Sequence, residues 1–224
     1  MIKNISNLGD AALYCDFGIE VNKQINSEVI KYFNTIKEKN IEGINNLTPS
    51  YNKLIISYDL RFTNFKEIKD KIEKLDVGEA LKINNKKLEI PVCCDASFSL
   101  DMARLENKLN LTKEKILENF FNKEFFCYMT GFIAGMPFLG DLDENMRAQR
   151  LETPRVKVPK GSVGITEQFA DIYTFESPGG WNIIGNTPLE VFDSSKEIEP
   201  NLINPGDTVK FKQITLDEYK NYNE

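Results

Sequence analysis

The chain of 224 residues contains no histidine. This absence removes the usual general base of enzymes and the commonest metal ligand. Ser-His-Asp and Cys-His catalysis within this chain are excluded, together with zinc sites that require histidine. We therefore expect no intrinsic metal site. An enzyme built from this chain would use carboxylates, lysines, main-chain dipoles, a nucleotide or residues of a partner.

The chain also lacks a block of basic residues and a long apolar run. Lysine and arginine total 28 against 34 aspartate and glutamate, for a net charge of -6. Neither nucleic acid nor an anionic membrane surface is expected as a partner. No window approaches the roughly 18 apolar residues of a membrane span, and the N-terminus has no apolar signal core. These features predict a cytoplasmic protein that is not bound to a membrane.

The four cysteines, Cys15, Cys93, Cys94 and Cys127, form no C-x-x-C pair. Reduced thiols in or near the core are the main interpretation, since free cysteine is among the most buried residue types. A cysteine nucleophile stays open, although no neighbouring sequence marks one.

The first third of the chain reads as a small α/β unit, because apolar residues recur with alternating strand and helix periods. Two helices are predicted, one capped by Asn26 or Ser27 and one opened by Asn64 with Glu67 three residues later. Strand, helix, strand, helix predicts a small sheet with helices packed on one face. The predicted elements are a strand at 12–15, a helix carrying Val29, Phe33 and Ile36, a turn at 48–50, a strand at 53–58, and a helix carrying Phe65, Ile68, Ile72 and Leu75.

A polar, turn-rich segment at 76–86 predicts the boundary between an N-terminal domain, 1–84, and a C-terminal domain, 85–224. Beyond it we predict a half-buried alternating strand at 87–92, short helices at 100–108 and 112–120, and a strand at 125–130. From Gly131 onward, short apolar runs alternate with Gly, Pro and Ser. This texture favours a β-barrel or sandwich that closes with a strand at 209–214. The fold class is therefore α+β.

Three segments of the C-terminal domain carry candidate chemistry. In Ser177-Pro178-Gly179-Gly180-Trp181, adjacent glycines can adopt positive φ and form an anion-binding nest, and Trp181 can wall a pocket; the alternative is a tight barrel turn pinned by a core tryptophan. In 153–165, Arg155 can hold a carboxylate or phosphate and Ser162 can supply a hydroxyl, or the segment is a solvated strand face and a turn. Alternation would place Arg155 and Lys157 on one face and Val156 and Val158 on the other. The stretch 131–140 reads as a buried loop or an apolar surface for a partner, not a phosphate loop.

The order and spacing of these segments together resemble the KipI / allophanate hydrolase subunit 1 family. The resemblance is carried by the runs GFIAGMPFLG, TPRVKVPKGSVGI and IYTFESPGGWNIIGNTPLEVFD, which cover residues 131–193. It departs from the family pattern at Ala134 and Met136. After Cys93 the family commonly has a Gly-rich run, of which this chain keeps only an Asp-Leu-like end near Asp101.

The resemblance implies a small N-terminal α/β sandwich domain followed by a cyclophilin-like, carboxyltransferase-type barrel. It also implies the role of the B component in an ATP-dependent 5-oxoprolinase, which opens the lactam of 5-oxoproline to give glutamate. ATP would be the co-substrate of a complex with an A component and a carboxyltransferase-like C component. Two alternatives share the motifs: a KipI-like inhibitor of a sporulation sensor histidine kinase, and an allophanate hydrolase-type component.

The residues on the family's motif positions are the candidate site. Arg155 and Ser162 are expected to be catalytic, and the residues expected to bind substrate or nucleotide are Ser177, Gly179, Gly180 and Trp181. A chain without histidine suits a site that is shared with a partner protein.

Overall fold

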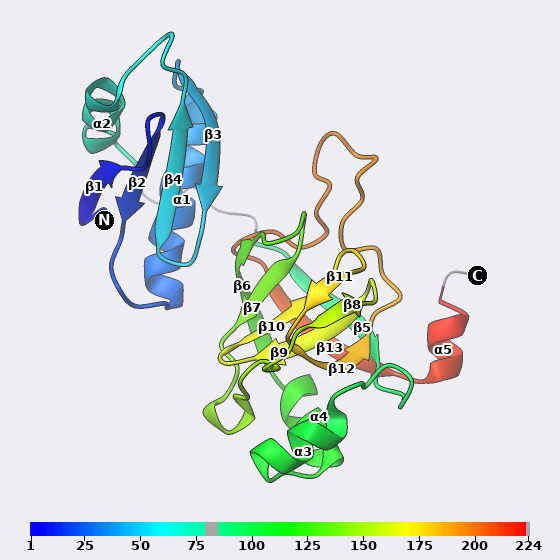
Figure 1. Cartoon of the computed structure of the whole chain (residues 1–224). Helices are drawn as coiled ribbons and strands as arrows, with labels where there is room; N and C mark the ends of the chain where they lie inside the picture. The colour runs from blue at the N-terminus through cyan, green and yellow to red at the C-terminus, as the bar shows by residue number, and fades with distance from the viewer. Residues whose placement is uncertain (79–84, 223–224) are drawn as a thin grey trace. The chain divides into compact units, whose positions relative to one another are not determined.

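The computed structural model describes residues 1–78 and 85–222 and divides into two compact units, Met1–Asn84 and Asn85–Glu224 (Figure 1). Part of the segment predicted as a boundary, residues 79–84, lies outside the described residues. That each unit folds as an independent domain stays a prediction. The mixed α+β class is confirmed, with a small helix-covered sheet in the first unit and a closed barrel in the second.

The first unit is a four-stranded antiparallel sheet covered by two helices. The strand order is β1-β2-β4-β3. Apolar residues from both helices and from β2 and β4 belong to one hydrophobic cluster, so both helices pack on one face of the sheet, as predicted. The elements are β1 (Asn4–Asn7), β2 (Ala12–Asp16), α1 (Lys23–Lys39), β3 (Ile44–Pro49), β4 (Lys53–Tyr58) and α2 (Phe65–Glu73).

Two strands of this sheet, β1 and β3, were not predicted. Both are edge strands, and their sequences, NISN and INNLTP, are too polar to show a clear apolar alternation. Pairing with the inner strands through main-chain hydrogen bonds holds them in place. The predicted turn at 48–50 is therefore wrong by two residues, because β3 continues to Pro49.

The predicted cap of the first helix is also wrong. Asn22 caps α1 by accepting a hydrogen bond from the Ile25 N–H at 2.9 Å. Asn26 lies inside the helix, fully buried, and its side-chain amide donates to the carbonyls of Ser50 and Tyr51. The polar residue thus fixes the turn before β4 instead of starting the helix. The predicted cap of α2 is confirmed, since Asn64 accepts from the Glu67 N–H.

The second unit is a closed barrel of seven strands in the order β10-β7-β6-β13-β5-β12-β9. A parallel pair of β5 and β13 joins its first and last strands, and a two-stranded sheet of β8 and β11 accompanies the barrel. The elements are β5 (Lys87–Cys93), α3 (Met102–Leu109), α4 (Lys113–Phe121), β6 (Glu124–Thr130), β7 (Pro137–Gly140), η1 (Glu144–Met146), β8 (Arg155–Val158), β9 (Ser162–Thr166), β10 (Phe169–Ile172), β11 (Ser177–Gly179), β12 (Asn182–Asn186), β13 (Thr208–Ile214) and α5 (Leu216–Lys220).

The barrel interior is filled by a large apolar core, which we call the large core. Its aromatic centre is Phe120 of α4 with Phe125 of β6 and Phe211 of β13, with ring centroids 4.8–5.5 Å apart. Strand β5 was predicted to be half-buried, but residues 90–93 are all buried. The predicted alternation holds only at residues 87–89. It ends in the half of the strand that pairs with β12 at Cys93, and α5 packs against β5.

All four cysteines are buried and free, as predicted. Burial raises the pKa of Cys15 and of Cys94 to about 12, so neither thiol is a reactive thiolate at neutral pH. No helix in residues 1–78 and 85–222 is long and apolar enough to cross a membrane.

Candidate functional site

The segment that carries the Ser-Pro-Gly-Gly-Trp motif forms β11 and the bend that follows it. Strand β11 pairs antiparallel with β8, with Ser177 opposite Val158 and Gly179 opposite Arg155. Two of the three motif segments are therefore adjacent in space. This pairing places Arg155 beside the glycines, as a shared site requires.

Neither glycine of the motif adopts the positive φ that an anion-binding nest needs. The expected nest is wrong, and the reason for Gly179 is a close contact. A Cβ built on Gly179 would lie 2.1 Å from the hydroxyl oxygen of Tyr173, a side chain that is itself buried. At Gly180 the nearest atom to such a Cβ is 3.6 Å away. The absence of a Cβ at Gly179 therefore allows the Tyr173 side chain to pack against β11.

Arg155 forms an ion pair with Asp101, whose side chain is 5% exposed. One guanidinium nitrogen, Nη2, donates to Asp101 Oδ1 at 2.6 Å, while Oδ2 accepts from the Ile183 N–H at 2.7 Å. Asp101 therefore ties the start of α3 to β8 and β12. The other guanidinium nitrogen, Nη1, is buried and has no hydrogen-bond partner among the described residues. Arg155 is held in place and keeps donor capacity.

The prediction that Val156 and Val158 share one face of β8 does not describe their environments. Val158 is fully buried, whereas Val156 is 81% exposed. Lys157 pairs with Glu176 across the β8–β11 sheet at 2.8 Å. The register of the β8–β11 pair shifts between Ser177 and Gly179, so β8 has one extra residue there and the regular alternation of its side chains is broken.

A small apolar cluster lies beside this sheet. It consists of Met136, Val158, Tyr173 and Ile183, with Ile133 and Trp181 packed against it. We call these residues, together with the polar side chains Arg155, Asp171 and Ser177 around Tyr173, the Tyr173 cluster. Trp181 is half-buried, and its ring meets Phe138 edge-on at 5.6 Å. Trp181 thus packs against the edge of this cluster while remaining partly exposed, and its role as the wall of a pocket stays a prediction.

Ser162 lies on the neighbouring barrel strand β9 and is buried. It is joined to the Tyr173 cluster through the main chain, because the Tyr173 N–H donates to the Ser162 carbonyl at 2.9 Å. The adjacent Gly161 has φ +80 and lines a cleft of about 490 Å³ with Lys160, Glu190 and Lys220. The structure therefore groups Arg155, Ser177, Gly179 and Trp181, whereas Ser162 is buried and does not line this cleft.

The hairpin between β6 and β7 contains the third motif segment. Phe132 adopts φ +69 and is 76% exposed, whereas Met136 is fully buried in the Tyr173 cluster. The segment thus has an exposed tip and a buried end, and an apolar surface for a partner at this tip stays a prediction.

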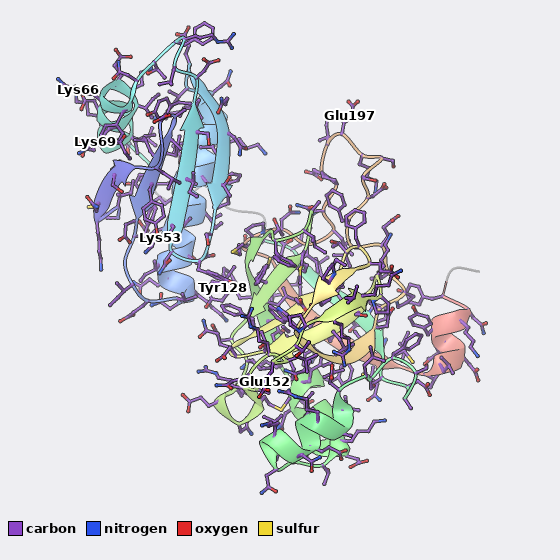
Figure 2. All side chains as sticks on the ribbon, in the orientation of Figure 1. Lys53, Lys66, Lys69, Tyr128, Glu152 and Glu197 are labelled. Atoms are coloured by element: carbon purple, nitrogen blue, oxygen red, sulfur yellow. The ribbon has the colours of Figure 1, made fainter. Side chains whose placement is uncertain are left out.

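The long connection between β12 and β13 also extends away from the barrel, with Glu197 at its tip (Figure 2).

Asp101, Asp171 and Tyr173 were not predicted as site residues from the sequence. Asp171 is fully buried, which holds the pKa of its carboxyl well above the ordinary value, partly offset by a hydrogen bond from the Gly164 N–H at 3.0 Å. Burial also raises the pKa of Tyr173; Asp171 adds to the rise, whereas the Trp181 N–H and Arg155 oppose it. The signal was an ionisable residue inside the apolar strand sequence FADIY.

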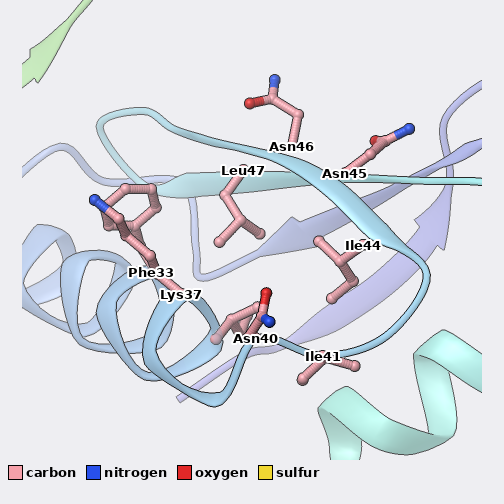
Figure 3. A pocket seen from close by; sticks show the side chains of 9 residues that line it. Phe33, Lys37, Asn40, Ile41, Ile44, Asn45, Asn46 and Leu47 are labelled. Carbon is pink, nitrogen blue, oxygen red and sulfur yellow. The ribbon is translucent and has the colours of Figure 1, made fainter. Parts of the chain in front are cut away.

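A cavity of about 370 Å³ lies in the first unit, between the end of α1 and β3 (Figure 3). Its lining includes one charged side chain, Lys37, and none of the predicted site residues. The barrel unit carries the stronger candidate site, because the motif segments and the perturbed ionisable groups converge there. The described residues contain no group of three or more Cys, Asp or Glu side chains arranged to hold a metal ion.

The chain is similar over most of its length to one protein family and to named subunits of one enzyme. The family model for the carboxyltransferase domain, subdomain C and D, matches residues 3–203. The chain is 33% identical to the B subunit of the 5-oxoprolinase of Bacillus subtilis, over 98% of this chain and 96% of that protein. It is 32% identical to the B subunit of the 5-oxoprolinase of Haemophilus influenzae, over 93% and 96%.

Among solved structures, the protein TTHA0988 superposes with a TM-score of 0.82 and 27% identity. The match covers 92% of this chain and 40% of TTHA0988, so this chain spans less than half of that structure. The likeness supports the sandwich-plus-barrel architecture described above.

Proposed function

Because the chain belongs to the family of carboxyltransferase domains, subdomains C and D, we propose that it is the B component of an ATP-dependent 5-oxoprolinase. The observation that carries this function is the match to named 5-oxoprolinase B subunits over nearly their whole length. It favours this function over an inhibitor of a sensor histidine kinase and over an allophanate hydrolase-type component. The motif resemblance to the KipI / allophanate hydrolase subunit 1 family is confirmed by the same matches.

The reaction opens the lactam of 5-oxoproline to give glutamate and uses ATP. A lactam is a stable amide, so transfer of the γ-phosphoryl group to its oxygen would turn that oxygen into part of a leaving phosphate. Water can then attack the carbonyl carbon, and the ring C–N bond breaks to give the acyl phosphate of glutamate. A second water hydrolyses this acyl phosphate to glutamate and phosphate, while ADP is the product of the phosphoryl transfer. Negative charge on oxygen must be stabilised along this path.

In this proposal Arg155 is the main cationic group of the chain's half of the site. Asp101 orients one side of its guanidinium, and the buried Nη1 is left to donate to an anionic oxygen. Ser177 and the backbone at Gly179 and Gly180 line the same place, and Trp181 walls it. Ser162 supplies a hydroxyl from β9. ATP hydrolysis belongs to the complex, with the A and C components as partners; a cytoplasmic location stays a prediction from the sequence.

Purification of the tagged chain from its own cells tests the assignment. The A and C components should co-purify in fixed ratio, whereas recovery of a histidine kinase in their place would contradict it. In the assembled complex, Arg155→Ala should reduce 5-oxoproline-dependent ATP hydrolysis by about 100-fold, the scale of one lost charge-stabilising donor. Unchanged hydrolysis would show that Arg155 has no such role. Lys157→Ala is the matched control, since Lys157 lies on the same strand and pairs with Glu176.

A further inference from the structure

Four buried side-chain atoms of the Tyr173 cluster lack a hydrogen-bond partner among the described residues. They are Arg155 Nη1, Asp171 Oδ2, Tyr173 Oη and Ser177 Oγ. Each such atom costs about 1–3 kcal/mol, because folding removes its hydrogen bond to water without replacing it. Four such atoms in one cluster lower the stability of the folded protein by an amount that apolar packing gives no reason to retain.

The backbone brings these four groups to one another. Asp171 and Tyr173 are two residues apart at the end of β10, so their side chains leave the same face of the chain. Ser177 and Gly179 are likewise two apart on β11, and Gly179 lies directly against the Tyr173 hydroxyl. Arg155 is paired with Gly179. The Tyr173 hydroxyl is therefore the meeting point of three strands.

A second glycine, Gly164, leaves room for the side chain of Asp171. A Cβ on Gly164, which pairs with Asp171, would lie 2.6 Å from Asp171 Oδ1 and 3.0 Å from Trp181 Cβ. Trp181 and the carboxyl thus flank the same glycine. The cluster reaches solvent along Arg155, whose side chain is 27% exposed, and along Ser177, which is half-buried.

Three of the groups always carry a hydrogen to donate, namely a guanidinium N–H and two hydroxyls. Burial raises the pKa of the Asp171 carboxyl, which favours its protonated form, the form that can donate as well. A set made of donors matches a ligand that offers only acceptors, such as a carboxylate or a phosphoryl group. A protonated Asp171 is compatible with an anion, whereas an ionised Asp171 would repel it.

We propose that Tyr173, together with Arg155 and Ser177, binds an anionic oxygen of the substrate or of ATP, and that Asp171 completes this subsite by donating a hydrogen bond. The inference rests on the proposed function and adds Tyr173 and Asp171 to the residues that perform it. Gly179 and Gly164 are the small residues that make room for the two buried groups.

The test uses Tyr173→Phe, which deletes the hydroxyl oxygen alone, in the complete 5-oxoprolinase complex. Loss of one hydrogen bond to a charged ligand should raise a KM by about 10- to 100-fold. A rise in the KM for 5-oxoproline identifies the bound group as its carboxylate, and a rise in the KM for ATP identifies it as a phosphoryl group. If both KM values stay unchanged, the inference is wrong. Tyr128→Phe is the matched control: its hydroxyl is bonded to Asp141 at 2.8 Å outside the cluster, and both KM values should stay unchanged.

A second readout on the isolated chain separates binding from a structural role. Among the described residues, no hydrogen bond of the Tyr173 hydroxyl has normal geometry, and only a weak contact from the Trp181 N–H acts on it. Tyr173→Phe should therefore change the free energy of unfolding by less than about 1 kcal/mol, measured by urea denaturation. A clear loss of stability would show a structural hydrogen bond and overturn the inference. Turnover by the wild-type complex reports on the proposed function separately, so the failure of one is distinguishable from the failure of the other.

Discussion

Asp171 and Asp207 are both buried aspartates of the barrel unit, yet their surroundings differ. Each oxygen of Asp207 accepts a main-chain N–H at 2.8 Å, from Lys86 and from Asn204. Asp171 has one such bond, from Gly164, and its second oxygen has no partner in the described structure. Asp207 serves the fold, because it fixes the turn before β13 against the start of β5. The second oxygen of Asp171 remains available for a hydrogen bond, as is typical of a residue that binds a ligand.

The same contrast separates the large core from the Tyr173 cluster. The large core consists of aliphatic, aromatic and sulfur side chains that fill the barrel. The Tyr173 cluster is small and has donors around its one tyrosine. The large core should therefore determine stability, whereas changes in the Tyr173 cluster should affect function more than stability.

The largest effect is expected from Phe120→Ala. This ring is fully buried and packs on Phe125 and Phe211, so its removal should lower the free energy of unfolding by about 3–5 kcal/mol. Urea denaturation of the chain measures the change. Val156→Ala is the control, because that side chain is 81% exposed and should change stability by about 0.5 kcal/mol or less. Equal losses in both variants would contradict the assignment of the core.

A smaller effect separates the two motif glycines. Gly179→Ala would place a Cβ against the buried Tyr173 hydroxyl and should cost about 1–3 kcal/mol, because neither the ring nor the strand can yield freely. Gly180→Ala meets nothing closer than 3.6 Å and should be nearly neutral. Thermal unfolding of both variants checks the difference. The reverse order of stabilities would mean that the contact between Gly179 and Tyr173 is not the reason for the glycine.

Asp171 should make the stability depend on pH. Its folded-state pKa is raised by burial, so the folded form holds the proton more tightly than the unfolded chain. The stabilisation is complete below the unfolded pKa, about 3.9, and is lost as pH rises toward the raised folded value, by about 1.4 kcal/mol per pH unit.

Asp171→Asn removes this slope, which urea denaturation between pH 5 and pH 8 can measure. The stability of the variant relative to wild type should therefore increase with pH. Parallel pH curves for the two proteins would show that Asp171 is ionised in the folded state. Asp207→Asn should instead destabilise by about 1–3 kcal/mol at pH 7, because an amide nitrogen cannot accept a main-chain N–H.

Much of the fold was predictable because apolar residues recur at regular strand or helix spacing in its inner elements. Strand β4 was predicted with its observed bounds, and α2 with its cap, since alternation and an Asn-Glu pair are local signals. The edge strands β1 and β3 were missed because backbone pairing, not apolar patterning, defines them. The burial of residues 90–93 in β5 was missed because it depends on β12 and α5, which are distant in sequence and leave no local pattern.

The sequence predicted which motif residues belong to the candidate site, but not the contacts between strands that bring them together. Arg155 and Ser177 could be named, but their neighbour Tyr173 could not, because the contact through Gly179 arises only when β11 reaches the end of β10. The glycines were expected to bind an anion through positive φ. In the structure, Gly179 makes room for a side chain, and the proposed donors are side-chain groups.

Omission of this chain from the reaction mixture shows whether it is a component of an ATP-dependent 5-oxoprolinase. The three components are mixed with ATP and 5-oxoproline, and glutamate and ADP are measured with and without this chain. Both products should form together in the complete mixture and fall to background when this chain is left out. Undiminished production of glutamate and ADP without it would show that the chain is not a component of the enzyme.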